Sequence, residues 1–261
     1  MQVELIRSCG TDLDVVNNAK VSFSKESKEI GDKEKSLLSF LARGISTADF
    51  NKFIIETANT AEEWINWGIP DCKSAFVERL KLWRRTPEHW APFANGISAT
   101  LRIKAPIFVA RQLDKHQVGF VKSEVSRRYV STNPEVLYPN KWRAKADNVK
   151  QGSSDEAVRN IAHRGGTYSP DVVYSGLMEQ SIRLYHDLIG GGVCEEQARM
   201  VLPQSMYTEW IWTGSLYGWS RLCNQRGDRN HAQKETADIS DKISDICSKL
   251  WPISWKELTD D

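Results

Sequence analysis

The chain reads Lys115-His116-Gln117-Val118-Gly119-Phe120-Val121-Lys122-Ser123-Glu124-Val125-Ser126-Arg127-Arg128-Tyr129 near its middle, a short span that gathers cations, a histidine, hydroxyls and a carboxylate. An apolar run, residues 105–110, precedes it and ends in the polar pair Arg111-Gln112. A nucleoside monophosphate needs a receptor for its dianion, which guanidinium and hydroxyl groups provide through charged hydrogen bonds. From these residues alone, Glu124 and Arg128 could also be a surface ion pair on a polar strand.

Two downstream segments supply further arginine and histidine: Ala198-Arg199-Met200-Val201-Leu202-Pro203 and Arg226-Gly227-Asp228-Arg229-Asn230-His231-Ala232-Gln233. Taken by itself, Arg199 follows two glutamates, so an ion pair on a helix surface is its simplest role. Arg226 follows a long apolar segment, where a cation stabilises a helix C-terminus. A lone histidine such as His116 is more often a hydrogen-bonded structural residue than a catalyst. None of these residues indicates a function by itself, and only their combination is informative.

Composition limits the classes of partner. Among the 261 residues, 35 Lys and Arg nearly balance 34 Asp and Glu, so the formal net charge is +1 and a globally basic nucleic-acid binder is not indicated. No apolar run reaches the roughly 18 residues of a membrane span. The segment Met1–Arg7 has the pattern of a first strand and lacks that of a signal peptide. We therefore expect a cytoplasmic protein that binds small molecules, with neither nucleic acid nor membrane as partner.

The cysteines indicate reduced thiols. The chain has five, scattered and without a C-x-x-C pair: Cys9, Cys72, Cys194, Cys223 and Cys247. This pattern predicts neither disulfides nor a metal site. None lies in an evident nucleophile setting. The ten tryptophans are expected mainly in the core and in subunit contacts, because each buries a large apolar area.

The hydrophobic pattern predicts many helices and a few strands that are not consecutive, which is typical of an α+β domain. We expect strands at residues 1–7, 97–103 and 136–138 and a mobile loop at 140–155. We expect helices at residues 12–23, 32–41, 106–113, 172–189, 195–201, 208–225 and 230–250, with a further helical block between about 45 and 86.

Taken together, these segments resemble the flavin-dependent thymidylate synthases, the ThyX family. Glu124-Val125-Ser126-Arg127-Arg128-Tyr129 fits the second half of the family signature, Glu-x-Ser-x-Arg-Tyr, and Lys115-His116-Gln117 stands where the family has Arg-His-Arg. Ala19-Lys20-Val21-Ser22-Phe23 and His89-Trp90-Ala91-Pro92-Phe93 match further family segments in the same order. The resemblance implies one ThyX-like domain over residues 1–261, with helices packed on a small mixed or antiparallel sheet. The block at about 45–86 would be a helical insertion in it.

One group of polar residues would hold dUMP, as the resemblance implies. Its members are Gln112, Glu124, Ser126, Arg127, Arg128, Arg199 and Arg226. Ser126 and Arg128 would lie near the phosphate and Arg226 near the pyrimidine. Ser126 and Arg226 are the catalytic candidates, because a cation beside the pyrimidine carbonyls would stabilise enolate-like charge when C5 becomes nucleophilic.

A second group would face the flavin: Ser22, His89, Lys115, His116, Gln117, Arg221 and His231. The implied enzyme is an FAD-dependent methyltransferase that converts dUMP to dTMP. 5,10-Methylenetetrahydrofolate would supply the carbon, NADPH would reduce FAD, and the flavin would supply hydride. Family members are homotetramers with active sites built from several subunits, so the same assembly is expected here.

The departures from the family lie on the flavin side. Gln117 replaces an arginine, and Phe120 lies where a small polar residue is usual. Ser215, Tyr217 and Arg221 occupy places where the family tends to have Asn, Arg and Asn. Two alternatives stay open: a related enzyme that hydroxymethylates C5 or accepts dCMP, and a nucleotide-binding homologue without catalysis.

Overall fold

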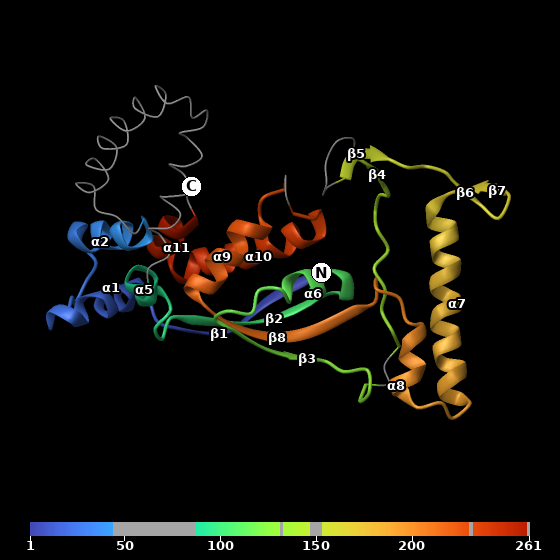
Figure 1. Ribbon diagram of the computed structural model, residues 1–261, viewed down its shortest axis with the longest axis horizontal. Helices are drawn as coiled ribbons and strands as arrows, with labels where there is room; N and C mark the ends of the chain where they lie inside the picture. Colours follow the sequence, from blue (N-terminus) through green and yellow to red (C-terminus); the bar gives the residue numbers. More distant parts are fainter. Residues whose placement is uncertain (44–86, 131–132, 147–152, 230–231, 260–261) are drawn as a thin grey trace, which may run out of the picture. The chain divides into compact units, whose positions relative to one another are not determined.

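The computed structural model describes residues 1–43, 87–130, 133–146, 153–229 and 232–259 (Figure 1). They fall into two compact units. The first comprises Met1–Ile6, Thr100–Thr213 and Leu222–Ile243, and the second Arg7–Ala99, Gly214–Arg221 and Ser244–Asp261. The predicted helical insertion at about 45–86 lies outside the described residues. The single domain over 1–261 stays a prediction.

A sheet with the strand order β1-β2-β8-β3 provides the frame of the first unit. Its strands are β1 (Gln2–Cys9), β2 (Ser98–Pro106), β3 (Phe120–Glu124) and β8 (Tyr207–Ser215). In β2, Leu101 and Ile103 are fully buried on either side of the exposed Arg102. This is the alternation that a half-buried strand requires. The strands expected at residues 1–7 and 97–103 are thus confirmed.

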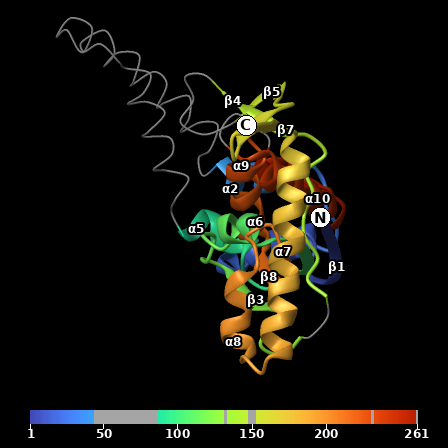
Figure 2. The ribbon, with the colours of Figure 1, turned by 90° about the vertical axis from the view of Figure 1, so that its right-hand side faces the viewer.

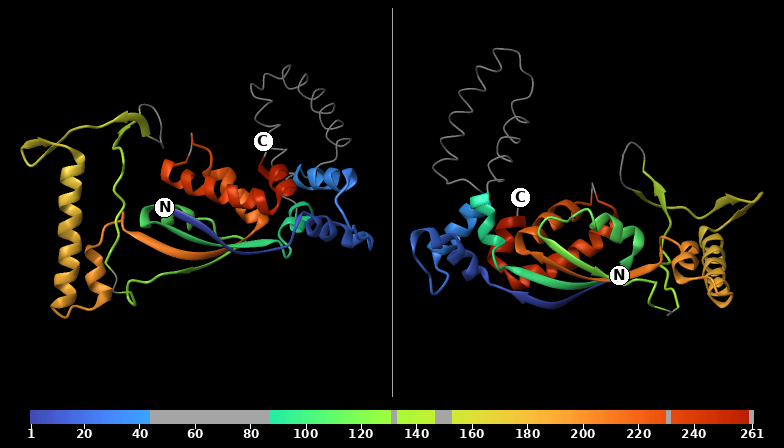
Figure 3. Two further views of the ribbon diagram at one scale, coloured as in Figure 1. Left: turned by 180° about the vertical axis from the view of Figure 1, so that it is seen from behind. Right: turned by 60° about the horizontal axis from the view of Figure 1, so that its bottom comes forward.

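Helices of the first unit cover one face of this sheet (Figures 1 and 3). They are α6 (Ile107–Leu113) and the first part of α10 (Lys234–Leu250). Val109 and Leu113 of α6 are fully buried, as are Ala237, Ile239 and Ile243 of α10. Both helices were expected at these places, and Pro106 precedes the first turn of α6 as predicted.

A long helix, α7 (Pro170–Gly190), lies beside the short α8 (Glu195–Ala198) and the 3-10 turn η3 (Arg199–Val201) (Figures 1 and 2). The Ser181 hydroxyl of α7 donates a hydrogen bond to the carbonyl of Val201. Among the described residues, no helix combines the length and the apolar character needed to cross a bilayer.

Part of the region expected as loop or helix is strand. β4 (Arg143–Lys145) pairs antiparallel with β5 (Ser153–Ala157), and β6 (Ile161–His163) pairs with β7 (Gly166–Tyr168). The loop predicted at 140–155 is wrong over its described ends, because pairing with a partner strand, which local polarity does not reveal, supplies the backbone hydrogen bonds. Residues 136–138 form only an isolated bridge, between Val136 and Met206.

The helix predicted at 208–225 is also wrong in its first half. Residues Tyr207–Ser215 are β8, and α9 (Leu216–Arg226) begins only after it. Trp210 and Trp212 are buried, whereas Ile211 between them is 40% exposed, so the period is that of a strand. Aromatic and β-branched residues favour this conformation, and the apolar run masked the change of period.

The second unit is mainly helical, and a buried carboxylate links its first and last helices. Its elements include α1 (Asp12–Lys20), η1 (Val21–Phe23), α2 (Asp32–Arg43), α5 (Pro87–Trp90), η2 (Ala91–Phe93) and α11 (Pro252–Thr259). The Asp12 carboxylate, only 6% exposed, accepts backbone hydrogen bonds from Ile253 (3.0 Å) and Ser254 (2.9 Å). Asp12 therefore satisfies free N–H groups at the start of α11. No sequence pattern predicted α11.

Glu34 predicts an acid-sensitive contact in this unit. Its carboxylate accepts hydrogen bonds from Lys20 Nζ (2.6 Å) and the Ser27 hydroxyl (2.8 Å), which lower its pKa from 4.5 to about 2. A depressed pKa stabilises the fold above about pH 4.5, and that contribution disappears as pH falls towards 2. We expect Glu34→Gln to lower the melting temperature at neutral pH, with the difference from wild type vanishing near pH 2. Melting curves across this range check it, and a difference that does not depend on pH would contradict it.

Candidate functional site

A pocket of about 870 Å³ opens in the first unit where β3 ends. Four of the residues predicted to hold the nucleotide line it: Glu124, Ser126, Arg127 and Arg199. Glu124 is the last residue of β3, and the backbone N–H of Tyr129 closes a turn onto the carbonyl of Ser126 at 3.0 Å. This turn brings the signature residues to the same pocket as Arg199, which lies far away in the sequence.

The pocket mixes cations and carboxylates. Arg127, Arg199, Arg111 and Lys104 line it together with Glu124, Glu135, Glu196 and Glu209. Arg111, Lys104 and Tyr207 were not predicted as site residues, and Arg111 was named only as the polar neighbour of Gln112. For Arg111 the position directly before Gln112 was an available signal. The others come from strands whose polar residues resembled ordinary surface positions.

Arg128 lies at the border of this pocket. Its Nε donates to the Ser126 hydroxyl at 3.3 Å, and its Nη1 lies 3.6 Å from a carboxylate oxygen of Glu196, which lines the pocket. The side chains of Arg128 and Glu196 are 45% and 65% exposed. An ion pair so exposed contributes only about 0–1 kcal/mol to the free energy of folding. The guanidinium can therefore leave Glu196 for an anion that it binds more strongly, at low cost in free energy.

Glu124 is held more firmly than its neighbours. Its Oε1 accepts from the Thr208 hydroxyl at 2.7 Å and its Oε2 from Lys122 Nζ at 2.7 Å. Nearby, burial and then the charge of Glu135 raise the pKa of Tyr207, which keeps its phenol neutral and able to donate. The pocket thus offers both fixed acceptors and donors to a ligand.

Gln112 and Arg226 do not line this pocket; Arg226 instead contacts both His116 and Gln112. Arg226 Nε donates to His116 Nε2 at 2.9 Å, and Arg226 Nη2 donates to the Gln112 carbonyl at 3.4 Å. The Gln112 side-chain oxygen accepts from the Thr236 hydroxyl at 2.9 Å. Because His116 Nε2 accepts, this hydrogen bond needs an imidazole without a proton on that nitrogen. The structure therefore splits the predicted nucleotide residues between two clusters of the first unit.

The predicted flavin residues belong to both units. In the first, Lys115 and Gln117 are exposed in the segment between α6 and β3. In the second, His89 contacts the Phe40 ring edge-on, with centroids 5.7 Å apart, and Ser22 lies in η1. His231 falls outside the described residues.

Phe120, Ser215, Tyr217 and Arg221, which depart from the family pattern, have partners inside this chain. Phe120 packs against Trp212, with ring centroids 4.6 Å apart, and the Ser215 hydroxyl accepts from the Gly218 N–H at 3.1 Å. Tyr217 stacks on Trp90 at 5.4 Å with an interplanar angle of 13°, and the Arg221 guanidinium lies 5.9 Å from the Tyr217 ring. These substitutions therefore have structural roles of their own.

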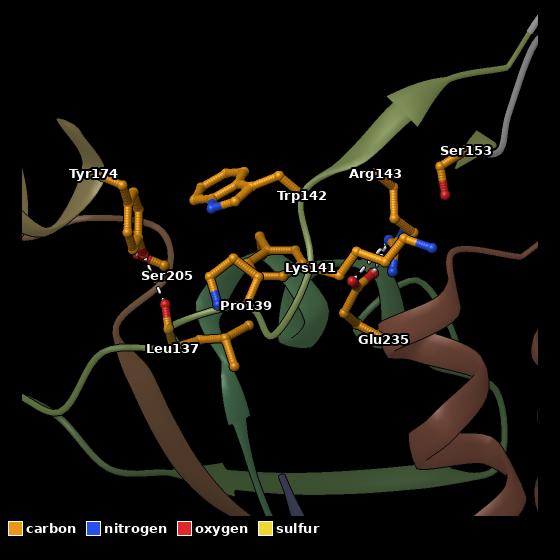
Figure 4. Close-up of a pocket in the computed structure, with 10 residues that line it drawn as sticks. Leu137, Pro139, Lys141, Trp142, Arg143, Ser153, Tyr174, Ser205 and Glu235 are labelled. Atoms are coloured by element: carbon orange, nitrogen blue, oxygen red, sulfur yellow. Dashed lines mark hydrogen bonds and ion pairs between the residues drawn. The ribbon is translucent and has the colours of Figure 1, made fainter. Parts of the chain in front are cut away.

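A smaller pocket, of about 320 Å³, lies beside the start of α10 (Figure 4). Trp142 meets Tyr174 edge-on at 5.1 Å, and Arg143 Nη2 donates to both carboxylate oxygens of Glu235, at 2.8 and 3.0 Å. The Tyr174 hydroxyl donates to Ser205 Oγ at 2.6 Å. These polar groups satisfy one another, so the larger pocket is the better candidate for a charged ligand.

The described cysteines give no nucleophile at either pocket. Cys223 is buried, and burial raises the pKa of its thiol to about 12. Within the described ranges, no group of three or more His, Cys, Asp or Glu side chains could hold a metal ion.

Alkylation of the native protein tests the cysteine assignment. At about pH 8 we expect iodoacetamide to modify the exposed Cys9 and Cys194 and to leave Cys223 unmodified, because only thiolates react rapidly. Peptide mapping by mass spectrometry measures this, with denatured protein as the control in which all thiols react. Rapid modification of Cys223 in the native state would contradict the assignment.

Comparisons with known proteins agree on one family. A family model described as "Thymidylate synthase complementing protein" matches residues 4–253. A flavin-dependent thymidylate synthase of Thermosipho melanesiensis is 34% identical over 171 residues, which cover 66% of this chain and 71% of the relative. One from Treponema denticola is 25% identical over 258 residues, covering 97% and 76%.

A solved structure supports the fold. A UMP/dUMP methylase, PolB from Streptomyces cacaoi, bound with 5-Br dUMP, superposes with a TM-score of 0.66 at 22% identity, covering 99% of this chain and 94% of that one. At this identity the similarity establishes the architecture alone. The expected α+β architecture of helices with small sheets is confirmed.

Proposed function

The chain belongs to the thymidylate synthase complementing protein family, the flavin-dependent thymidylate synthases, and we propose that it catalyses the reductive methylation of dUMP to dTMP. One observation carries the proposal: Glu124, Ser126, Arg127 and Arg199, from segments far apart in sequence, line one pocket. Two of these are guanidinium groups, which suit the phosphate dianion, and the pocket is large enough for a nucleotide.

Ser126 and Arg128 would bind the phosphate. They already share a hydrogen bond between Arg128 Nε and Ser126 Oγ, so the pair is oriented before a ligand arrives. A planar guanidinium can present two parallel donors to phosphate oxygens, which the exposed ion pair with Glu196 leaves accessible. Phosphate binding would replace the weak ion pair between Arg128 and Glu196 by a stronger interaction between Arg128 and the phosphate.

Gln112 and Arg226 would act on the pyrimidine of a site shared between subunits. They lie apart from the pocket that their own chain lines, which agrees with a homotetramer in which one subunit completes the site of another. Arg226 would stabilise negative charge on the pyrimidine carbonyls while C5 becomes nucleophilic. Its contacts with His116 and the Gln112 carbonyl fix the orientation of the guanidinium.

The predicted flavin residues fit FAD by their chemistry. A flavin dinucleotide offers a planar ring system and two phosphates, and the set includes the cations Lys115 and Arg221, the imidazoles His89 and His116, and the amide Gln117. When bound, FAD supplies the hydride, with NADPH as its reductant and 5,10-methylenetetrahydrofolate as the carbon donor. The protein residues bind and orient these molecules.

Nucleotide binding tests the placement of the phosphate. We expect Arg128→Ala to weaken dUMP binding about 10- to 100-fold, because a hydrogen bond to a charged group contributes about 1.5–3 kcal/mol. Titration calorimetry measures the affinity. Arg229→Ala is the control, because Arg229 pairs only with acidic residues of α10, Asp238 and Asp241, among its described contacts. Equal affinities in wild type and Arg128→Ala would contradict this placement.

The reaction itself has a direct test. We expect the purified protein to show a bound-flavin absorption spectrum that NADPH bleaches, and to form dTMP from dUMP and methylenetetrahydrofolate. Product mass separates the outcomes, because a hydroxymethylated product differs from dTMP by one oxygen atom. Binding of dUMP without bound flavin or turnover would overturn the proposed reaction and leave only nucleotide binding.

A further inference from the structure

We propose that Lys122 is a positioning residue, which sets the Glu124 carboxylate at the angle in which it receives the nucleotide. The inference rests on the proposed function, because it concerns the same pocket. Lys122 does not line that pocket and is not among the residues that the family signature assigns.

Lys122 is held on three sides. Its Nζ lies 2.6 Å from Asp114 Oδ1 and 2.7 Å from Glu124 Oε2, and 4.7 Å from the ring centroid of Trp210. The Lys122 side chain is 19% exposed, and Trp210 is 1% exposed. A largely buried ammonium with two carboxylates and a ring face around it has little freedom to move. It is therefore a fixed point from which Glu124 can be oriented.

The placement follows from the strand. Lys122 and Glu124 are two residues apart in β3, so their side chains leave the same face of the sheet. Asp114 is the C-cap of α6, the helix that carries Arg111 and Gln112. Lys122 thus ties the end of α6 to the end of β3 through one ammonium group.

Glu124 keeps acceptor capacity for a ligand. Its two oxygens have about four lone-pair sites, and Lys122 and Thr208 occupy one on each oxygen. The backbone beyond it is fixed as well, because the Val125 N–H donates to the Glu209 carbonyl at 2.9 Å. The remaining lone pairs can accept from a donor of the nucleotide, such as the pyrimidine N3–H or a sugar hydroxyl. Without Lys122 the carboxylate would lose one of its two side-chain hydrogen bonds and rotate about its terminal torsion.

A double-mutant cycle tests this, with dUMP affinity as the readout. We expect Lys122→Met to weaken binding about tenfold, and Lys122→Arg to recover most of the loss, because a guanidinium can also bridge two carboxylates. In a Glu124→Gln background, adding Lys122→Met should change the affinity less than about twofold, because Lys122 acts through Glu124. Asp114→Asn removes the other carboxylate that holds Lys122, outside the pocket, so it should also weaken dUMP binding only when Glu124 is present. This variant replaces Lys122→Met if Lys122→Met does not fold.

Lys242→Met is the matched control, since Lys242 is exposed and bonds only to the Met1 carbonyl among its described hydrogen bonds. It should bind dUMP as wild type does. Two outcomes would overturn the positioning role, provided that wild type binds dUMP. One is that the loss of affinity in Lys122→Met adds fully to the loss in Glu124→Gln. The other is that Lys122→Met binds dUMP as tightly as wild type. Wild-type protein that fails to bind dUMP would instead overturn the proposed function, and the inference with it.

Discussion

The burial of Trp210 and Trp212 on one side of β8 is the constraint on which the first unit depends. Side chains alternate along a strand, so a shift of one residue would expose both indoles and turn Thr208, on the same face, away from Glu124. Tyr207, Thr208 and Glu209, at the start of the same strand, line the large pocket. Core packing in β8 thereby fixes the position of the groups that hold Glu124.

The segment after Leu202 contributes residues to the walls of both pockets. Gln204 and Met206 line the large pocket, whereas Ser205 between them lines the smaller one. The backbone is held on α6, where the Phe108 N–H donates to the Gln204 carbonyl at 3.1 Å and the Ile107 N–H to the Met206 carbonyl at 2.9 Å. Both pocket walls therefore depend on the docking of α6, whose buried Val109 and Leu113 secure it.

Sequence patterns predicted the helices with a clear apolar stripe, because the stripe reports directly on burial. They failed at β8, where frequent aromatic and aliphatic residues on both sides of Leu216 hide the change from strand to helix. They also failed at the β4–β5 and β6–β7 pairs, because strand pairing depends on a distant partner that local composition does not record. For the site, the family resemblance predicted Glu124, Ser126, Arg127 and Arg199, which line one pocket. It could not predict Lys104 or Tyr207, whose place in the pocket is decided by strand order.

Two of the departures on the flavin side, Tyr217 and Arg221, lie in the second unit and contact each other. The Tyr217 ring stacks on Trp90 at an interplanar angle of 13°, and the Arg221 guanidinium lies 5.9 Å from the centroid of the same Tyr217 ring. A ring at position 217 provides a face for Arg221 that an arginine there would not, and two neighbouring guanidinium groups would repel each other. Tyr217 and Arg221 are therefore compatible as a pair. The family pattern has arginine at position 217 and asparagine at position 221. The pair in this chain keeps one positive charge and moves it about one helical turn along α9, from position 217 to position 221. Within this pair, the positive charge is therefore displaced along α9 rather than lost.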